Sequence, residues 1–169
     1  RLARARLDLV SEGPTDLPVH QGTLRGAIWR SYALLDPAEQ EMLCSLSVFA
    51  GGFDLAAVEA LHPEPSAATR LHLLVSKSLV KSSDAPHGEK RFFLLETVRE
   101  FAGEQLAANG EGQRWHERHL RHFLALAAAY RAGADEPTRA ARLQGELDNL
   151  RSALRWAIQH EPVAAQQMV

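Results

Sequence analysis

Cysteine is nearly absent from the sequence, which has one, Cys44, in 169 residues. A single cysteine excludes an internal disulfide framework and a zinc site built on cysteine ligands. Its apolar neighbours predict that Cys44 is a buried, unreactive thiol. Long apolar runs are missing too, since the stretch 124–130 falls far short of the roughly 20 residues of a membrane-spanning helix. With no signal-peptide pattern at the start, we expect a soluble, cytoplasmic protein without a membrane partner.

An excess of charge of one sign is also missing. The chain has 19 Lys and Arg against 21 Asp and Glu, a formal net charge of −2. Within residues 16–110 the counts are 8 and 12, a net charge of −4. Because Lys and Arg that neutralise phosphates supply most of the affinity for DNA, this balance does not favour nucleic acid as a partner.

No phosphate-binding loop is present. The glycine-rich positions are Gly51-Gly52 and Gly110-Glu111-Gly112. Neither precedes a Lys-Ser or Lys-Thr pair at the spacing that wraps backbone amides around a phosphate. We therefore expect no cofactor in this chain and no nucleotide hydrolysis by it alone.

Metal and nucleophile signatures are incomplete. His116, His119 and His122 follow one another at intervals of three, but the third turns away on a helix and no carboxylate or cysteine completes four ligands. We expect no metal site there, and solvated histidines on a helix surface. Ser45 and Ser47 lack the glycine elbow and paired histidine that mark a nucleophile. The sequence predicts no enzyme.

The first two thirds of the chain predict a winged helix. Capping and breaker residues such as Asp36-Pro37, Asp54 and Ser66 separate successive short apolar periodicities. Two short extended runs follow, joined by a loop with Pro86 and Gly88. The expected helices cover 23–35, 36–50, 54–61 and 66–77, and the expected strands cover 78–81 and 90–95. This order is that of a mainly α protein with a small two-stranded β wing.

The last third predicts an antiparallel helical hairpin. A helix closed by Asn109-Gly110 precedes a long helix over 113–131 and a last helix that begins near 137. Its apolar stripe includes four leucines that we expect to serve interdomain packing: Leu143, Leu147, Leu150 and Leu154. The expected domains are 1–22, the end of a preceding helical lobe and a linker; 23–109, the winged helix; and 110–169, the helices that follow it.

A winged helix raises the hypothesis of DNA binding, because its third helix can enter the major groove. The residues that would make contact are Arg70, Lys77, Lys81, Lys90 and Arg91. Asp84 and Glu89 offset part of the wing's charge, and the third helix holds no Asn or Gln. We therefore expect direct DNA binding by this chain to be unfavourable, and keep an autonomous DNA-binding module as the alternative.

Six blocks of the sequence resemble the region that follows the nucleotide-binding domain in bacterial STAND ATPases. These are large NB-ARC-like regulators, many of them transcription factors of the LuxR or SARP type. The blocks are TLRGAIWRSY (23–32), LLDPAEQ (34–40), LSVFAGGF (46–53), LVSKSLV (74–80), LLETVREFA (94–102) and LDNLR (147–151).

The resemblance implies that ADP or ATP binds the full-length protein and that the winged helix closes over it. Many relatives carry Met-His-Asp before the helix after the wing, where this chain has Leu94-Leu95-Glu96. The resemblance therefore places Leu95 and Glu96 toward the nucleotide. It implies that residues 110–169 are the first helices of a superhelical sensor region of tetratricopeptide type. It also implies an upstream nucleotide-binding domain and downstream helical repeats as partners, and a homo-oligomer of the full-length protein.

Because the sequence begins with Arg1 rather than Met, we expect a piece of a longer protein. The resemblance implies a non-catalytic regulatory fragment of a bacterial transcriptional regulator. It would act through interdomain and protein–protein contacts that control a nucleotide switch.

Overall fold

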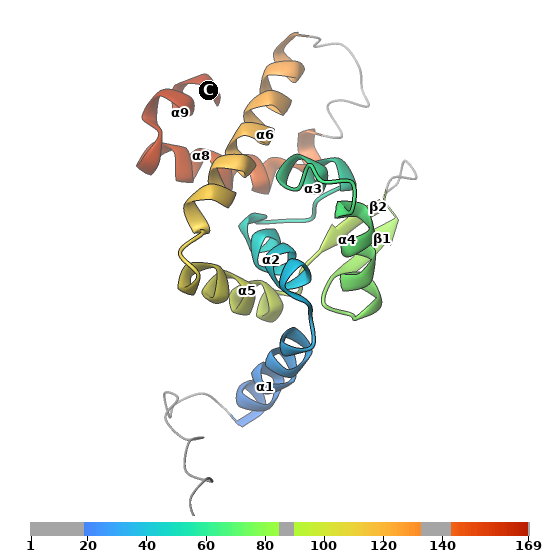
Figure 1. The fold of residues 1–169 in the computed structure, drawn as a ribbon. Coiled ribbons are helices and arrows are strands. Elements are labelled where there is room, and N and C mark those ends of the chain that lie inside the picture. Colours follow the sequence, from blue (N-terminus) through green and yellow to red (C-terminus); the bar gives the residue numbers. More distant parts are fainter. Residues whose placement is uncertain (1–18, 85–89, 133–142, 169) are drawn as a thin grey trace, which may run out of the picture.

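The computed structural model describes residues 19–84, 90–132 and 143–168. Its elements are α1 (Val19–Ala33), α2 (Pro37–Ser45), the 3₁₀ turn η1 (Leu46–Val48), α3 (Leu55–Leu61), α4 (Ala67–Ser76), β1 (Lys81–Asp84), β2 (Lys90–Phe93), α5 (Glu96–Ala108), α6 (Gly112–Ala132), α8 (Leu147–His160) and α9 (Pro162–Met168) (Figure 1). The protein is mainly helical with one two-stranded sheet, as the sequence predicts. Most of the segment 1–22 lies outside the described residues.

Local capping explains where the first helices of the winged helix begin. Asp36 accepts a hydrogen bond from the Glu39 amide at 2.8 Å, and the Glu39 carboxylate accepts from the Asp36 amide at 2.9 Å. With Pro37 at the first position, this is a capping box. Asp54 caps α3 by accepting from the Ala57 amide at 2.7 Å. The predicted helix starts at 36 and 54 are confirmed.

The first strand of the wing lies later in the sequence than predicted. β1 and β2 are antiparallel, with Lys81 opposite Phe93 and Asp84 opposite Lys90. Residues 78–80 were expected in the first strand, but they form the turn that follows α4 instead. The Leu79 amide donates to the Leu74 carbonyl at 3.0 Å and Ser78 has φ 61°, the left-handed geometry of a Schellman motif. α1 also differs, since it begins at Val19 rather than near Thr23.

A third chain segment completes the winged helix. Phe53 forms a bridge with Phe92, and each amide donates to the other's carbonyl, at 2.8 and 2.7 Å. This gives the order α2, α3, α4 and a wing whose central strand is β2. The predicted winged helix followed by further helices is confirmed.

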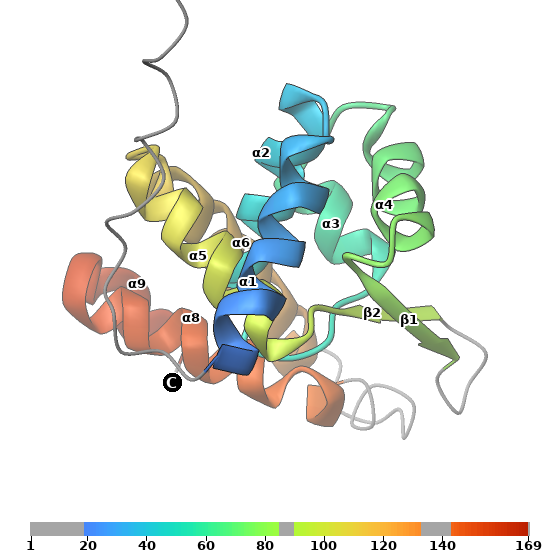
Figure 2. The same ribbon diagram turned by 90° about the horizontal axis from the view of Figure 1, so that it is seen from below.

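The helices after the wing share a core with the winged helix. Trp115, Leu120 and Phe123 of α6 are buried in the same apolar cluster as Phe49 and Leu61. Figure 2 shows α4 and the wing on one side of the molecule and α9 on the other. The boundary between residues 109 and 110 stays a prediction.

Candidate nucleic-acid interface

The recognition helix α4 presents one row of side chains to solvent. Leu71 and Leu74 are buried, and Thr69, His72, Leu73 and Ser76 are exposed. Their spacing of three and four residues puts these four on one face of the helix. The Nδ1 of His72 donates to the Ala68 carbonyl at 2.7 Å. The face therefore offers hydroxyls, an imidazole and one apolar side chain.

The two cations that the sequence predicts on α4 are engaged by carboxylates of the same chain. Arg70 donates to Glu64 at 2.6 Å. Lys77 Nζ donates to both oxygens of Glu39, at 2.6 and 2.7 Å, and Glu39 is the buried partner of the α2 capping box. Each pair is neutral overall, so α4 carries little free positive charge.

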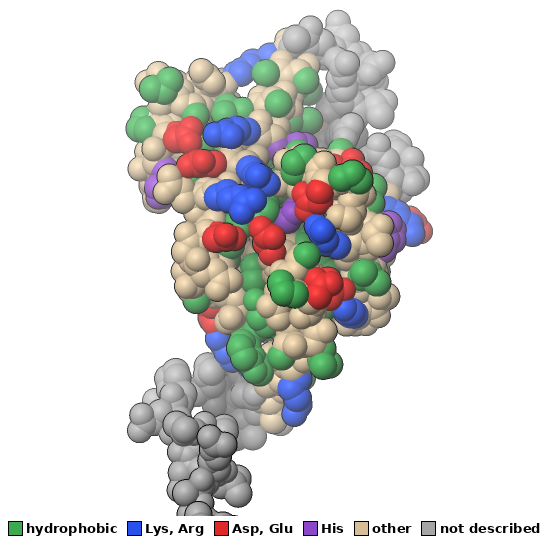
Figure 3. Space-filling view, in the orientation of Figure 1, with side chains coloured by type: hydrophobic (Ala, Val, Ile, Leu, Met, Phe, Trp, Pro, Cys, Tyr) green, Lys and Arg blue, Asp and Glu red, His purple; other side chains and the backbone are tan. Residues whose placement is uncertain are grey.

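The three predicted cations of the wing divide into two groups. Lys81 and Lys90 are exposed on β1 and β2. Arg91 instead turns toward the start of α8, where it pairs with Glu146 and donates to the Gly52 carbonyl at 2.6 Å. On the face shown in Figure 3, basic and acidic side chains are interspersed. The exposed amines of Lys81 and Lys90 are thus the wing groups placed to meet phosphates.

A buried hydrogen-bond array that the sequence did not indicate joins α2 to α4. Ser45 Oγ lies 2.6 Å from His62 Nε2, and His62 Nδ1 lies 3.2 Å from a Glu64 oxygen that also binds Arg70. The order resembles a nucleophile, base and orienting acid. Ser45 is fully buried and also contacts the Met42 carbonyl at 2.7 Å. No substrate can reach the hydroxyl there, so we assign the array a structural role, in which it stabilises the turn between α3 and α4.

The nucleotide-facing pair of the sequence analysis lies at the start of α5. Leu95 is the N-cap and is 46% exposed. Glu96 is exposed and pairs with Arg99 one turn later, at 2.6 Å. Both side chains are therefore open to a partner or ligand.

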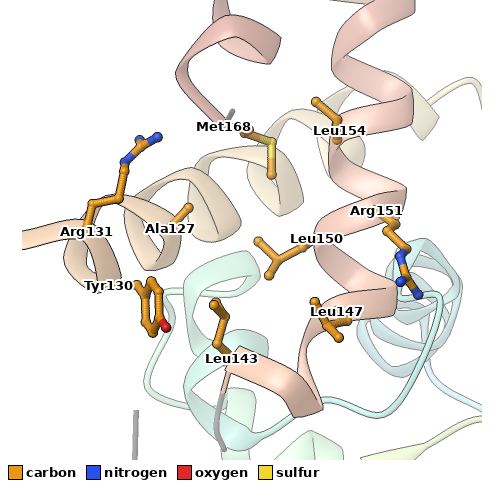
Figure 4. Close-up of a pocket in the computed structure, with 9 residues that line it drawn as sticks. All are labelled: Ala127, Tyr130, Arg131, Leu143, Leu147, Leu150, Arg151, Leu154 and Met168. Carbon is orange, nitrogen blue, oxygen red and sulfur yellow. The ribbon is translucent and has the colours of Figure 1, made fainter. Parts of the chain in front are cut away.

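The four leucines expected to pack between domains line a hollow of about 260 Å³ between α6, α8 and α9. They are Leu143, Leu147, Leu150 and Leu154. Figure 4 shows them together with Tyr130 and Met168. What covers this face stays a prediction.

The three histidines of α6 have separate surroundings. His119 is 1% exposed, between Phe49 and Phe123, which corrects the expectation of a solvated histidine. Its ring is covered because η1 packs on α6. His116 stacks on Trp156. Among the described residues no group of His, Cys, Asp or Glu is placed to hold a metal ion.

No helix in the described part of the chain is long and apolar enough to cross a membrane. Cys44 is buried, as predicted.

Comparison with known proteins agrees with the fold. Residues 35–107 match the winged helix-turn-helix domain family. A Mycobacterium tuberculosis protein named "Putative HTH-type transcriptional regulator" is 42% identical over 156 residues, 88% of this chain and 18% of that protein. A Mycobacterium bovis protein of the same description matches equally. An uncharacterized M. tuberculosis protein is 32% identical over 118 residues, 66% of this chain and 30% of the other. No solved structure matches.

These findings correct one expectation. Direct DNA binding was expected to be unfavourable because the segment 16–110 is acidic. The match to a winged helix-turn-helix family and the relatives named as HTH-type regulators point to DNA binding instead. Net charge was a poor guide because it does not say where the charges lie. Glu39 and Glu64 pair with Lys77 and Arg70, and Lys81 and Lys90 are exposed on the wing. The chain spans under a fifth of the length of the regulators it matches. Residues 35–107, which match the winged helix-turn-helix family, are the part of the chain that folds as α2 to α5 with the wing.

Proposed function

We propose that this chain is the non-catalytic, DNA-binding winged helix of a transcriptional regulator. The observation that carries the proposal is the exposed face of α4 beside a wing with two exposed lysines. Helices in this position of a helix-turn-helix protein read the major groove. The similarity to proteins named as HTH-type transcriptional regulators supports the same function.

The exposed groups suit different parts of a DNA site. Thr69, Ser76 and His72 can exchange hydrogen bonds with base edges, and Leu73 can contact a thymine methyl group. Lys81 and Lys90 lie on the wing and can pair with phosphates. Because Arg70 and Lys77 are paired with carboxylates of the same chain, binding of the protein would release few counterions from the DNA. We expect weak binding at physiological salt, with specificity from the α4 face.

The first prediction concerns the wing lysines. The double variant Lys81→Ala/Lys90→Ala is expected to weaken binding to a labelled random-sequence duplex about tenfold or more at low salt. The slope of log affinity against log salt should become shallower by about 2, one unit per phosphate contact. Fluorescence anisotropy across a salt series measures both quantities.

A matched control removes two exposed arginines far from α4. Arg121→Ala/Arg151→Ala changes the net charge by the same amount, on α6 and α8, and should leave affinity and slope close to those of the unaltered protein. An equal loss in both double variants would mean that binding follows net charge alone. Absence of binding by the unaltered chain at low salt would refute the proposed function.

A second candidate function is nucleotide-dependent control of the full-length protein. It is supported by the resemblance to STAND ATPases and by the exposed start of α5, where Leu95 caps the helix without a side-chain hydrogen bond. Helix N-termini favour anions because their first amides have no partner within the helix. In this proposal the full-length protein holds ADP or ATP, and Leu95 and Glu96 face the nucleotide.

Leu95→His in the full-length protein tests this candidate. An imidazole can donate to a phosphate and leucine cannot, so ADP is expected to bind about tenfold more tightly, the effect of one charge-assisted hydrogen bond. Leu34→His, at another exposed leucine, is the control and should change nothing. Equal ADP affinity in the Leu95→His and unaltered proteins would show that residue 95 does not face the nucleotide. Isothermal titration calorimetry gives the affinities.

A further inference from the structure

The start of α8 reaches the wing through a buried polar cluster that we call the wing clamp. It consists of Glu146 and Asn149, the backbone of residues 50–52, and Arg91 on β2. Asn149 is 1% exposed and Glu146 3% exposed. Buried polar side chains are stable only when their hydrogen bonds are made, so the contacts of these two residues need a full account.

Asn149 uses every hydrogen-bonding position of its amide. Its Oδ1 accepts from the Ala50 amide at 3.0 Å and from the Gly51 amide at 3.3 Å. Its Nδ2 donates to the Gly52 carbonyl at 2.9 Å and to the Glu146 carboxylate at 2.8 Å. One side chain of α8 therefore fixes three successive backbone groups that lie almost 100 residues earlier in the sequence.

Arg91 extends the clamp into the wing. Its guanidinium pairs with the other oxygen of Glu146 and donates to the carbonyls of Gly52, at 2.6 Å, and Gly145, at 3.2 Å. The next residue along β2, Phe92, forms the bridge with Phe53 directly after Gly52. A Cβ on Gly52 would lie 3.3 Å from the Phe92 carbonyl oxygen. The clamp and the bridge thus meet at Gly52.

The wing has little else to hold it in place. Its sheet has two strands of four residues, and an isolated hairpin of this kind is marginally stable in water. Every described residue of β1 is exposed, and on β2 only Phe92 is buried in the core. The wing is anchored at its base, because β1 directly follows Leu79 and Val80, which are buried. Beyond this base, its direction depends on the Phe92 contact and on the clamp.

We propose that Glu146 and Asn149 are positioning residues that hold the wing at its angle to α4, so that the placement of α8 controls DNA binding by the winged helix. The regulatory part rests on the proposed DNA-binding function. Displacement of α8 breaks the Asn149 and Glu146 contacts together, because Glu146 is the N-cap of this helix and Asn149 lies in its first turn. The wing then loses its fixed orientation while α2, α3 and α4 keep theirs.

Hydrogen exchange tests the clamp without DNA. In Asn149→Ala, the Phe53 and Phe92 amides are expected to exchange about tenfold faster, since their bridge opens more readily when its support is lost. Slowly exchanging core amides of α2 and α5 should keep their rates, which shows that the fold is intact. Asp148→Ala, on the exposed side of the same turn, should leave the bridge unchanged. Glu146→Gln, which keeps the shape but removes the charge beside Arg91, should act like Asn149→Ala. Unchanged bridge exchange in both clamp variants would overturn the proposal.

DNA binding distinguishes wing positioning from a merely structural role. In the intact protein, Lys90→Ala and His72→Ala should each weaken binding to a duplex that the unaltered protein has selected from a random-sequence pool. In Asn149→Ala the cost of Lys90→Ala should largely vanish, while that of His72→Ala stays the same, because only the wing has lost its orientation. An undiminished Lys90 effect would refute control through the wing. If the unaltered chain binds no DNA, the proposed function fails, and the exchange experiment alone decides whether the clamp positions the wing.

Discussion

Replacing His119 by Leu is expected to remove most of the loss of stability that this protein suffers as the pH falls from 6.5 toward 3. His119 is almost fully buried, with its ring 4.6 Å from Phe123 and 5.1 Å from Phe49 between centroids. Its Nε2 has no hydrogen-bond partner among the described residues. Burial, with smaller contributions from the neighbouring His116 and His122, lowers the pKa of His119 from 6.5 to about 3.

The direction of the effect follows from proton binding. Between pH 6.5 and about 3 the unfolded chain holds a proton on residue 119 and the folded chain does not. Falling pH therefore favours the unfolded state through this window, and the full stability is present above pH 6.5. A difference of this size in pKa corresponds to about 4 kcal/mol in the free energy of unfolding once the pH reaches the lower end. Burial also lowers the pKa values of His62 and His116, which gives contributions of the same sign.

Urea unfolding at pH 7 and about pH 4.5 measures the effect, which should be about 2 to 3 kcal/mol at the lower pH. At pH 7 the Leu variant should be at least as stable as the unaltered protein, because leucine fills the site without an unpaired polar atom. His72→Leu, at an exposed position of α4, is the control and should keep the full pH dependence. The same pH dependence in His119→Leu and the unaltered protein would contradict the assignment.

The elements that could be predicted from the sequence are those whose causes are local. Asp36, Pro37 and Glu39 form their capping box within four residues, and Asp54 caps α3 in the same way. The order of short helices and two strands then indicates the winged helix. The bounds of β1 were predicted wrongly because residues 78–80 belong to a Schellman motif. This motif depends on Ser78, a left-handed residue that is not glycine, and so it left no signal in the sequence.

The candidate site was less predictable because its electrostatics depend on residues distant in the chain. Arg70, Lys77 and Arg91 look alike in the sequence as cations of a helix and a wing. Their carboxylate partners differ in origin: Glu64 precedes α4, Glu39 lies on α2, and Glu146 lies before α8. A separation of 38 residues in one pair and 55 in another leaves no periodic signal. The five residues proposed for DNA contact could therefore be named from the sequence, but not sorted into free and paired cations.

Trp115→Ala is expected to destabilise the winged helix, although Trp115 lies outside residues 35–107. The indole is 1% exposed and stacks on His62 at 4.5 Å between centroids. The guanidinium groups of Arg114 and Arg118 lie over it, at 4.6 and 5.0 Å from the ring. Removing a fully buried aromatic side chain leaves a cavity and costs about 3 to 5 kcal/mol. His62 belongs to the array that fixes the α3–α4 turn, so the loss reaches the recognition helix.

In a Trp156→Phe background, which leaves Trp29 as the tryptophan that remains in Trp115→Ala, denaturant unfolding should show this cost in a single transition. The midpoint should be the same by Trp29 fluorescence, which reports on α1, and by far-ultraviolet circular dichroism, which reports on all helices. Trp156→Ala is the matched control, because Trp156 is only half-buried on α8, and it should cost about 1 to 2 kcal/mol. Separate transitions, with the Trp29 signal unaffected by Trp115→Ala, would contradict a shared core. In the expected case α6 is part of what holds α4 in place, so the recognition surface must be assayed with the helices that follow the wing.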